Sequence, residues 1–107
     1  HMVIRHARDV TIYGLKEEGP TSLWITDSDR IQVFGEGGIA NAPPGKTLFL
    51  VERTPNVRLV GLVDRTFRRG TPAGKRSMVR DVPESGALVQ TAPLDRLVLY
   101  KRGFHTR

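Results

Sequence analysis

The chain contains no cysteine and one tryptophan, and its sequence pattern gives little support for helices. Without cysteine, a disulfide framework and a cysteine-based zinc site are both excluded. No run of about 18 apolar residues is present, so we expect a soluble chain with no membrane-spanning helix. Proline and glycine pairs such as Gly19-Pro20 and Pro43-Pro44-Gly45 interrupt the stretches between apolar segments. Because these pairs end helices rather than extend them, we expect almost no helix.

A length of 107 residues allows one domain with a modest core. The first two residues, His1 and Met2, are typical of an expression-tag remnant, and we set them aside from the fold. We therefore expect a single domain over residues 3–103, excised from a larger protein, with a tail at 104–107.

The net charge of +6 is unevenly distributed. Residues 1–62 hold seven Lys or Arg and seven Asp or Glu, whereas residues 63–107 hold ten and four. Of the 17 basic residues, 13 are arginine, whose planar guanidinium pairs with two carboxylate, sulfate or phosphate oxygens at once. This composition favours an anionic partner.

One pattern occurs four times along the chain. Each copy begins with a β-branched residue, continues through a polar bend, and then places two apolar residues two positions apart, which indicates strands. The four copies are Ile4 to Gly14, Ile25 to Gly35, Val51 to Gly61 and Val89 to Lys101. The first two repeat distances, 21 and 26 residues, suit one circuit of a solenoid, and the third, 40 residues, indicates an insertion.

In such a solenoid, equivalent residues of successive circuits lie above one another, about 4.8 Å apart. The predicted inward columns are Ile4, Ile25, Val51 and Val89; Val10, Ile31, Val57 and Leu97; and Ile12, Val33, Leu59 and Leu99. Tyr13, Phe34 and Tyr100 share a further column, for which we expect a packing role. The sequence thus predicts an all-β fold: a right-handed parallel β-helix of about four coils, with a basic loop inserted at about 65–86 before the last coil.

The stretches "ITDSDRIQVFGEGG" and "VERTPNVRLVGLVD" resemble coils of right-handed parallel β-helix proteins of the pectate-lyase-like superfamily. More narrowly, "LWITDSDRIQVFGEGG", "APPGKTLFLVERTPNVRLVGLVD" and "RLVLYKRG" are similar to the closing coils of bacterial members that act on or bind polysaccharides. The resemblance covers about residues 3–103. It implies a carbohydrate-active parent protein of bacterial origin, secreted or periplasmic.

In that superfamily, catalysis uses clustered aspartates with calcium and a base, or paired aspartates with histidine and an Arg-Ile-Lys element. Here Asp27 and Asp29 stand two apart beside Arg30, Gln32 occupies the place of the lysine, and neither an Asp-Asp pair nor Gly-His-Gly occurs. We interpret both aspartates as turn residues. We therefore expect no enzymatic activity, no metal and no cofactor.

Outward-pointing polar rows and exposed aromatic rings are features that suit a glycan. Trp24, placed before the inward Ile25, is predicted to point outward, either as a platform for a sugar ring or as a packing residue. The insertion carries six basic residues between Arg65 and Arg80 and no acid, which suits either an anionic polymer or a solvated loop. The candidate carbohydrate-binding residues are Trp24, Arg58, Gln32, Arg5, Arg30, Arg68, Arg69, Lys75 and Arg76.

These features predict a non-catalytic polysaccharide-binding module that prefers an acidic glycan. Nucleic acid is not expected as a partner, because only Phe67 interleaves with the basic run and no recognition helix follows it. Two alternatives remain: a structural C-terminal fragment of a β-helical polysaccharide lyase or hydrolase, and a tailspike-like element that forms homo-oligomers through its open solenoid ends.

Overall fold

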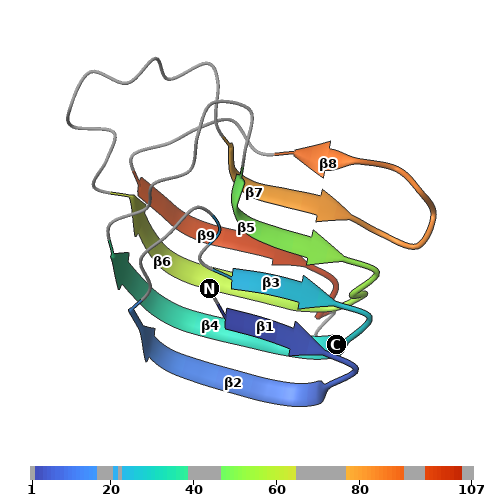
Figure 1. Ribbon diagram of the computed structural model, residues 1–107, viewed down its shortest axis with the longest axis horizontal. Helices are drawn as coiled ribbons and strands as arrows, with labels where there is room; N and C mark the ends of the chain where they lie inside the picture. Colours follow the sequence, from blue (N-terminus) through green and yellow to red (C-terminus); the bar gives the residue numbers. More distant parts are fainter. Residues whose placement is uncertain are drawn as a thin grey trace.

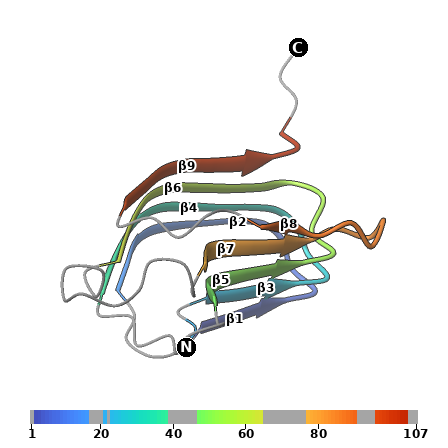
Figure 2. The same ribbon diagram turned by 90° about the horizontal axis from the view of Figure 1, so that it is seen from above.

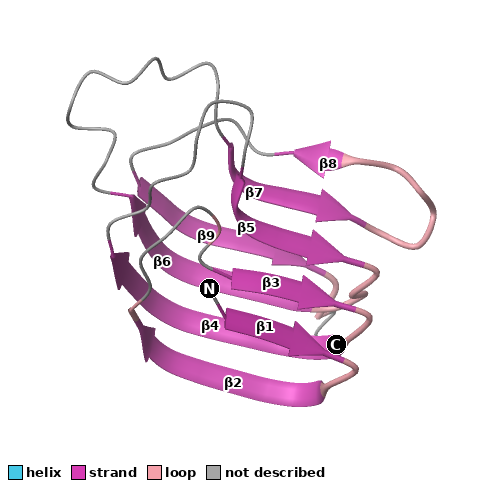
Figure 3. Ribbon diagram, in the orientation of Figure 1, coloured by secondary structure: helices cyan, strands magenta, loops and turns pink. Residues whose placement is uncertain are grey.

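The computed structural model describes residues 2–16, 21, 23–38, 47–64, 77–90 and 96–104, and these contain strands and turns but no helix (Figure 3). Two sheets stack face to face, and the chain alternates between them from β1 to β6 (Figures 1 and 2). The first sheet, in spatial order, contains β1 (Met2–Arg5), β3 (Leu23–Thr26), β5 (Thr47–Glu52), β7 (Ser77–Val82) and β8 (Val89–Gln90). The second contains β2 (Arg8–Leu15), β4 (Asp29–Gly38), β6 (Val57–Asp64) and β9 (Arg96–Arg102).

Pairing within both sheets is mostly parallel, as in a right-handed parallel β-helix of about four coils, which confirms the predicted fold class. The first three copies of the repeat stack in the expected register. In the first sheet Ile4 pairs with Ile25 and Ile25 with Val51, and in the second Ile31 pairs with both Val10 and Val57. Similar aliphatic side chains of successive coils therefore stack on one another in the space between the two sheets.

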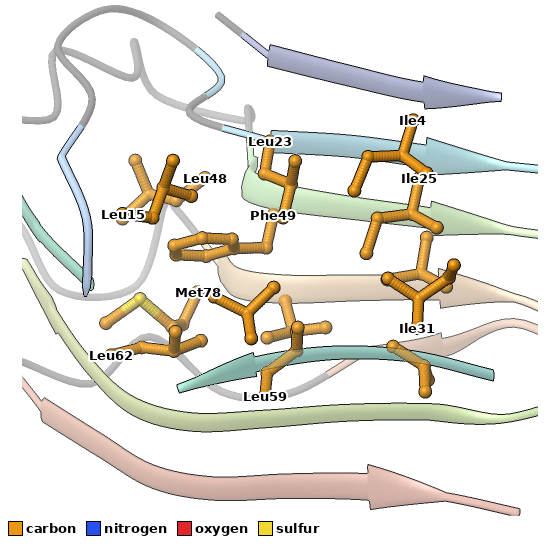
Figure 4. Close-up of a cluster of buried hydrophobic side chains, with 14 residues drawn as sticks. Ile4, Leu15, Leu23, Ile25, Ile31, Leu48, Phe49, Leu59, Leu62 and Met78 are labelled. Atoms are coloured by element: carbon orange, nitrogen blue, oxygen red, sulfur yellow. The ribbon is translucent and has the colours of Figure 1, made fainter. Parts of the chain in front are cut away.

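The core fills the space between the two sheets (Figure 4). Residues of the middle coils are the most completely buried, with Ile31, Val33, Val51 and Leu59 each 0% exposed. A fully buried aliphatic side chain of this size contributes about 1.5 to 3 kcal/mol. The repeated columns are thus the main source of stability.

Each coil turns from the first sheet to the second through one residue in the left-handed region. His6, Asp27 and Arg53 occupy this position, with φ of 52°, 49° and 46°. In the second and third corners the following residue closes the turn: the Ser28 hydroxyl donates to the Thr26 carbonyl at 2.8 Å, and the Thr54 hydroxyl donates to the Glu52 carbonyl at 3.0 Å. In the first corner the Ala7 amide donates to the Ser28 hydroxyl at 3.1 Å. We call the stacked corners of β1–β2, β3–β4 and β5–β6 the polar corner.

The fourth copy departs from the prediction, because β9 pairs antiparallel with β6. Tyr100, not Leu99, pairs with Leu59 and packs against the core, while Leu99 pairs with Val60 and is 54% exposed. Leu97 pairs with Leu62 rather than Val57. The predicted inward placement of Leu99 is therefore wrong, because period-two alternation reads the same in either chain direction.

Val89 is also misplaced by the prediction. It is 43% exposed and lies on the short β8, which pairs antiparallel with β7. The residue that pairs with Val51 is Asp81 on β7. That strand, Ser77–Val82, falls within the span predicted as the inserted loop.

Asp81 is an acid in a column otherwise filled by Ile and Val, and it is 0% exposed. Arg102 donates to its carboxylate from Nε at 2.5 Å and from Nη2 at 2.8 Å, and the Tyr100 hydroxyl donates to it at 2.5 Å. The pKa of Arg102 is raised by its hydrogen bond to Asp81. Burial, followed by the hydrogen bond to Asp81, raises the pKa of the Tyr100 phenol above its ordinary value of 10.0. This cluster joins the reversed β9 to the first sheet.

The stack has an open end at its first coil, since β1 and β2 are the edge strands of their sheets. Ile4 is 8% exposed against 1% for Ile25, and Val10 is half-buried where Ile31 is fully buried. The expected self-association through open ends stays a prediction. Within the described part of the chain, no helix is long and apolar enough to cross a bilayer.

Candidate functional site

The outward side of the second sheet carries two parallel rows of side chains, which we call the ladder face. Strand alternation places them on the side opposite the core, because their neighbours Ile31, Val33, Val57 and Leu59 are buried. One row is polar and the other is largely apolar. The polar row is Thr11, Gln32, Arg58 and Lys101, and the apolar row is Tyr13, Phe34, Val60 and Leu99.

The apolar row exposes an aromatic ring to solvent. Tyr13 is 76% exposed, and its ring stacks on Phe34 with centroids 5.5 Å apart and an interplanar angle of 17°. In this stacked pair, the ring face of Tyr13 that is turned away from Phe34 points along the stack direction, and the Tyr13 hydroxyl lies at the edge of the ring. The packing role predicted for this column does not describe Tyr13.

The polar row offers hydrogen-bonding groups and positive charge. Arg58 Nη1 donates to Gln32 Oε1 at 3.1 Å, so these two predicted site residues do lie together. Among the residues that the structure describes, no carboxylate lies within ion-pair distance of Arg58 or Lys101. Within that part of the chain, the two positive charges of this row are therefore not neutralised by acids of the protein.

Arg30 lies at the start of β4, in the left-handed region with φ of 57°. Its Nε donates to Asp9 Oδ1 at 2.6 Å, and its guanidinium lies 5.3 Å from the ring centre of Phe104. Arg58 lies 4.9 Å from the same ring. Arg30 thus borders the ladder face but already has an acidic partner.

Trp24 and Arg5, two further predicted residues, lie on the outward side of the first sheet. The indole Nε1 of Trp24 donates to Glu52 Oε1 at 2.6 Å, and the guanidinium of Arg5 lies 5.4 Å from the indole ring. Trp24 points outward as expected, between Val3 and Leu50 in the sheet. Because the core separates the two outer sides, these residues do not join Gln32 and Arg58.

The other four candidates, Arg68, Arg69, Lys75 and Arg76, lie outside the described residues. Their role as an anion-binding loop stays a prediction.

The polar corner contains an open cleft of about 480 Å³. Asp27 lines it together with Arg53, whose Nε and Nη2 donate to the two carboxylate oxygens at 2.5 and 3.0 Å. Hydrogen bonds from Arg53 and then Thr26 hold the pKa of Asp27 far below its ordinary value of 3.8, and the same contact with Asp27 raises the pKa of Arg53. Asp29 accepts a hydrogen bond from Asn56 Nδ2 at 2.8 Å.

This arrangement gives the two aspartates structural partners. An ion-paired Asp27 is a poor proton donor, and its partner Arg53 is already occupied. Among the described residues, no three His, Asp or Glu side chains are grouped to hold a metal ion. The cleft is therefore a polar surface in which Asp27 and Arg53 neutralise each other.

Sequence reasoning missed three residues of this region. The sequence predicts a packing role for Tyr13 because Tyr100 aligns with it, whereas the antiparallel β9 sends Tyr100 inward. Lys101 joins the ladder face for the same reason. Phe104 was placed in the tail, yet it is 9% exposed. For Tyr13 the sequence does contain a signal: Thr11 and Tyr13 flank the inward Ile12, so strand alternation places both on the outer side of the sheet.

Comparisons of the chain with protein-family models, with curated proteins and with solved structures gave no match.

Proposed function

We propose that the ladder face binds a polysaccharide, with a preference for acidic chains, and that the protein is a non-catalytic binding module. The observation that supports this most directly is the exposed Tyr13–Phe34 stack beside two cations that lack a carboxylate partner in the described part of the chain. An aromatic ring beside hydrogen-bonding and charged groups suits a sugar, which has both an apolar ring face and polar edges.

The spacing of the face fits an extended polymer. Neighbouring strands are about 4.8 Å apart, and the two rows are about 7 Å apart along each strand. A pyranose ring stacked on the open face of Tyr13 would lie beyond β2, next to Thr11. A polymer that continues from there across the polar row would bring the carboxylate of a further sugar to Arg58 on β6. A charge-assisted hydrogen bond from arginine to a carboxylate is about twice as strong as a neutral one.

The resemblance of the coils to those of pectate-lyase-like proteins supports the same substrate class, although it is a resemblance of architecture more than of chemistry. On this proposal the chain belongs with bacterial β-helical proteins that act on or bind polysaccharides, and works outside the cytoplasm. The ion-paired Asp27 and the partnered Asp29 support a binding role over a catalytic one.

Affinity electrophoresis in gels containing polygalacturonate or alginate, with dextran as the neutral polymer, tests the proposal. We expect the acidic polymers to retard the wild type more than dextran does, and added salt to reduce the retardation. Tyr13→Ala is expected to weaken binding to both kinds of polymer about fivefold, because it removes one ring contact. Arg58→Ala is expected to weaken binding to the acidic polymers about tenfold.

Matched controls lie on exposed positions away from the ladder face. Leu88→Ala removes an apolar side chain that is 50% exposed, and Arg80→Ala removes an exposed cation of the first sheet. Both are expected to bind as the wild type does. Binding that survives Tyr13→Ala and Arg58→Ala but is lost in Trp24→Ala would move the site to the first sheet, and no retardation of the wild type by any polymer would refute the proposal.

A further inference from the structure

Phe104 lies between two arginines at the edge of the ladder face. Its ring centre is 5.3 Å from the guanidinium of Arg30 and 4.9 Å from that of Arg58. Only 9% of the residue is exposed, although it follows the last strand of the fold. The ring is therefore held among folded residues and lies within cation–π distance of both guanidinium groups.

The backbone holds this ring in place through an unusual turn. Gly103 and Phe104 both have positive φ, 73° and 51°. The Phe104 amide donates to Asn56 Oδ1 at 2.6 Å, and a side chain on Gly103 would overlap that same oxygen and the Pro55 carbonyl. A non-glycine residue with positive φ is costly by about 1 kcal/mol or more, so the surrounding contacts must fix it.

Arg58 is constrained from two directions as a result. Its guanidinium carbon lies over the face of the Phe104 ring, and its Nη1 donates to Gln32 Oε1. A guanidinium has five N–H donors in one plane, and the contact with Gln32 engages one of them. The remaining N–H groups include a pair that can donate two parallel hydrogen bonds to a planar carboxylate.

From this geometry we infer that Phe104 is a positioning residue, which fixes the plane of Arg58 as a carboxylate fork and so gives the ladder face its selectivity for uronate over neutral sugars. This inference rests on the proposed polysaccharide-binding function. Ordering a long side chain costs about 0.5 to 1.5 kcal/mol when a ligand binds, and a preformed guanidinium avoids part of that cost. Lys101, the neighbouring cation, offers a point charge and no such fork.

The test compares two substitutions at position 104 that keep an apolar side chain. Phe104→Leu keeps apolar bulk but removes the ring face, whereas Phe104→Tyr keeps the face. Dissociation constants are measured by titration calorimetry for tri-galacturonate and for the neutral tri-galactose. We expect Phe104→Leu to weaken tri-galacturonate binding up to about tenfold, because Arg58 is then ordered only when the ligand binds, and to leave the neutral sugar within about twofold.

Rescue separates positioning from general stability. Phe104→Tyr is expected to retain the wild-type ratio of the two dissociation constants, and Arg58→Lys, which keeps the charge, is expected to lose that ratio as Phe104→Leu does. The ring-current shift on the Arg58 side-chain NMR signals, recorded without sugar, should disappear in Phe104→Leu and persist in Phe104→Tyr. Circular dichroism confirms that each variant is folded.

The outcomes distinguish this inference from the proposed function. If the wild type binds tri-galacturonate selectively and Phe104→Leu keeps the same ratio, the role of Phe104 is refuted while the binding face stands. An equal loss of affinity for both sugars would also refute it, since that result indicates a structural role alone. If the wild type binds neither sugar, the proposed function fails and this inference fails with it.

Discussion

The buried cluster of Asp81, Arg102 and Tyr100 predicts an asymmetry between single and double substitutions. Asp81 is 0% exposed and accepts three hydrogen bonds, two of them from Arg102. Arg102→Met removes both of these bonds and the only positive charge described beside the carboxylate. Breaking one partner of a buried ion pair leaves an uncompensated charge and costs about 3 to 5 kcal/mol.

Asp81→Val should cost less, because Arg102 keeps other acceptors. Its Nη2 donates to the Thr54 carbonyl at 2.6 Å and its Nη1 to the Pro55 carbonyl at 3.1 Å, and its side chain is 25% exposed to water. We expect a cost of about 1 to 2 kcal/mol, within the range for hydrogen bonds to charged groups. The valine would continue the column of Ile4, Ile25 and Val51.

The double variant Asp81→Val/Arg102→Met removes both charges at once. Replacing a buried ion pair with apolar side chains is often neutral or stabilising, so we expect its stability within about 1 kcal/mol of the wild type. The free energy of unfolding is measured by urea denaturation at neutral pH, with the slope m compared among all four proteins.

Two results would refute the reasoning. One is a cost below about 1 kcal/mol for Arg102→Met, which would show that Asp81 finds water or protonates easily. The other is a double variant as unstable as Arg102→Met, which would show that Arg102 stabilises the fold by a route independent of Asp81.

Two further predictions concern the corners and bends of the coils. The pKa of Asp27 is lowered by Arg53, so the contribution of Asp27 to stability is present above about pH 4 and is lost as the pH falls further. The difference in unfolding free energy between the wild type and Asp27→Asn should therefore shrink on acidification. A constant difference from pH 7 to about pH 2 would contradict this. Gly35 has φ of 80° and an added Cβ would meet nothing closer than 4.0 Å, so Gly35→Ala should cost about 1 to 2 kcal/mol of stability from backbone strain alone. Gly35→Asn should cost less in the same urea assay, because asparagine tolerates positive φ. Equal costs for the two variants would argue against strain.

The sequence was sufficient to predict the first three coils because each core position repeats the same kind of residue. Ile4, Ile25 and Val51 pair as expected, and the inward columns of the second sheet do so as well. A parallel stack requires every coil to present one face to its neighbours, so the regularity of the fold is visible as regularity of the sequence.

The last coil was not predictable by the same reasoning. Alternating apolar residues in "RLVLYKR" specify a strand but not its direction, and an antiparallel β9 exchanges the sides of Leu99 and Tyr100 relative to the parallel alignment. The buried position of Asp81 in the first sheet is not predictable from the sequence either, because an acid is expected at a core position only when its partners are known. Those partners, Tyr100 and Arg102, lie about 20 residues further along the chain.

The candidate site follows from the same stacking that builds the core. Because inward columns fix the register, the residues between them must form rows on the outside, and this places Gln32 beside Arg58 and Tyr13 beside Phe34. Both outer sides carry an aromatic residue and arginine, so residue type alone does not separate them. What distinguishes them is that Trp24 already bonds Glu52 and lies near Arg5, whereas the ring of Tyr13 is 76% exposed and stacks on Phe34 alone among the described aromatic residues. A ligand gains most where a protein leaves its groups without partners, and this is why we propose the ladder face, with its exposed Tyr13 ring, as the binding surface.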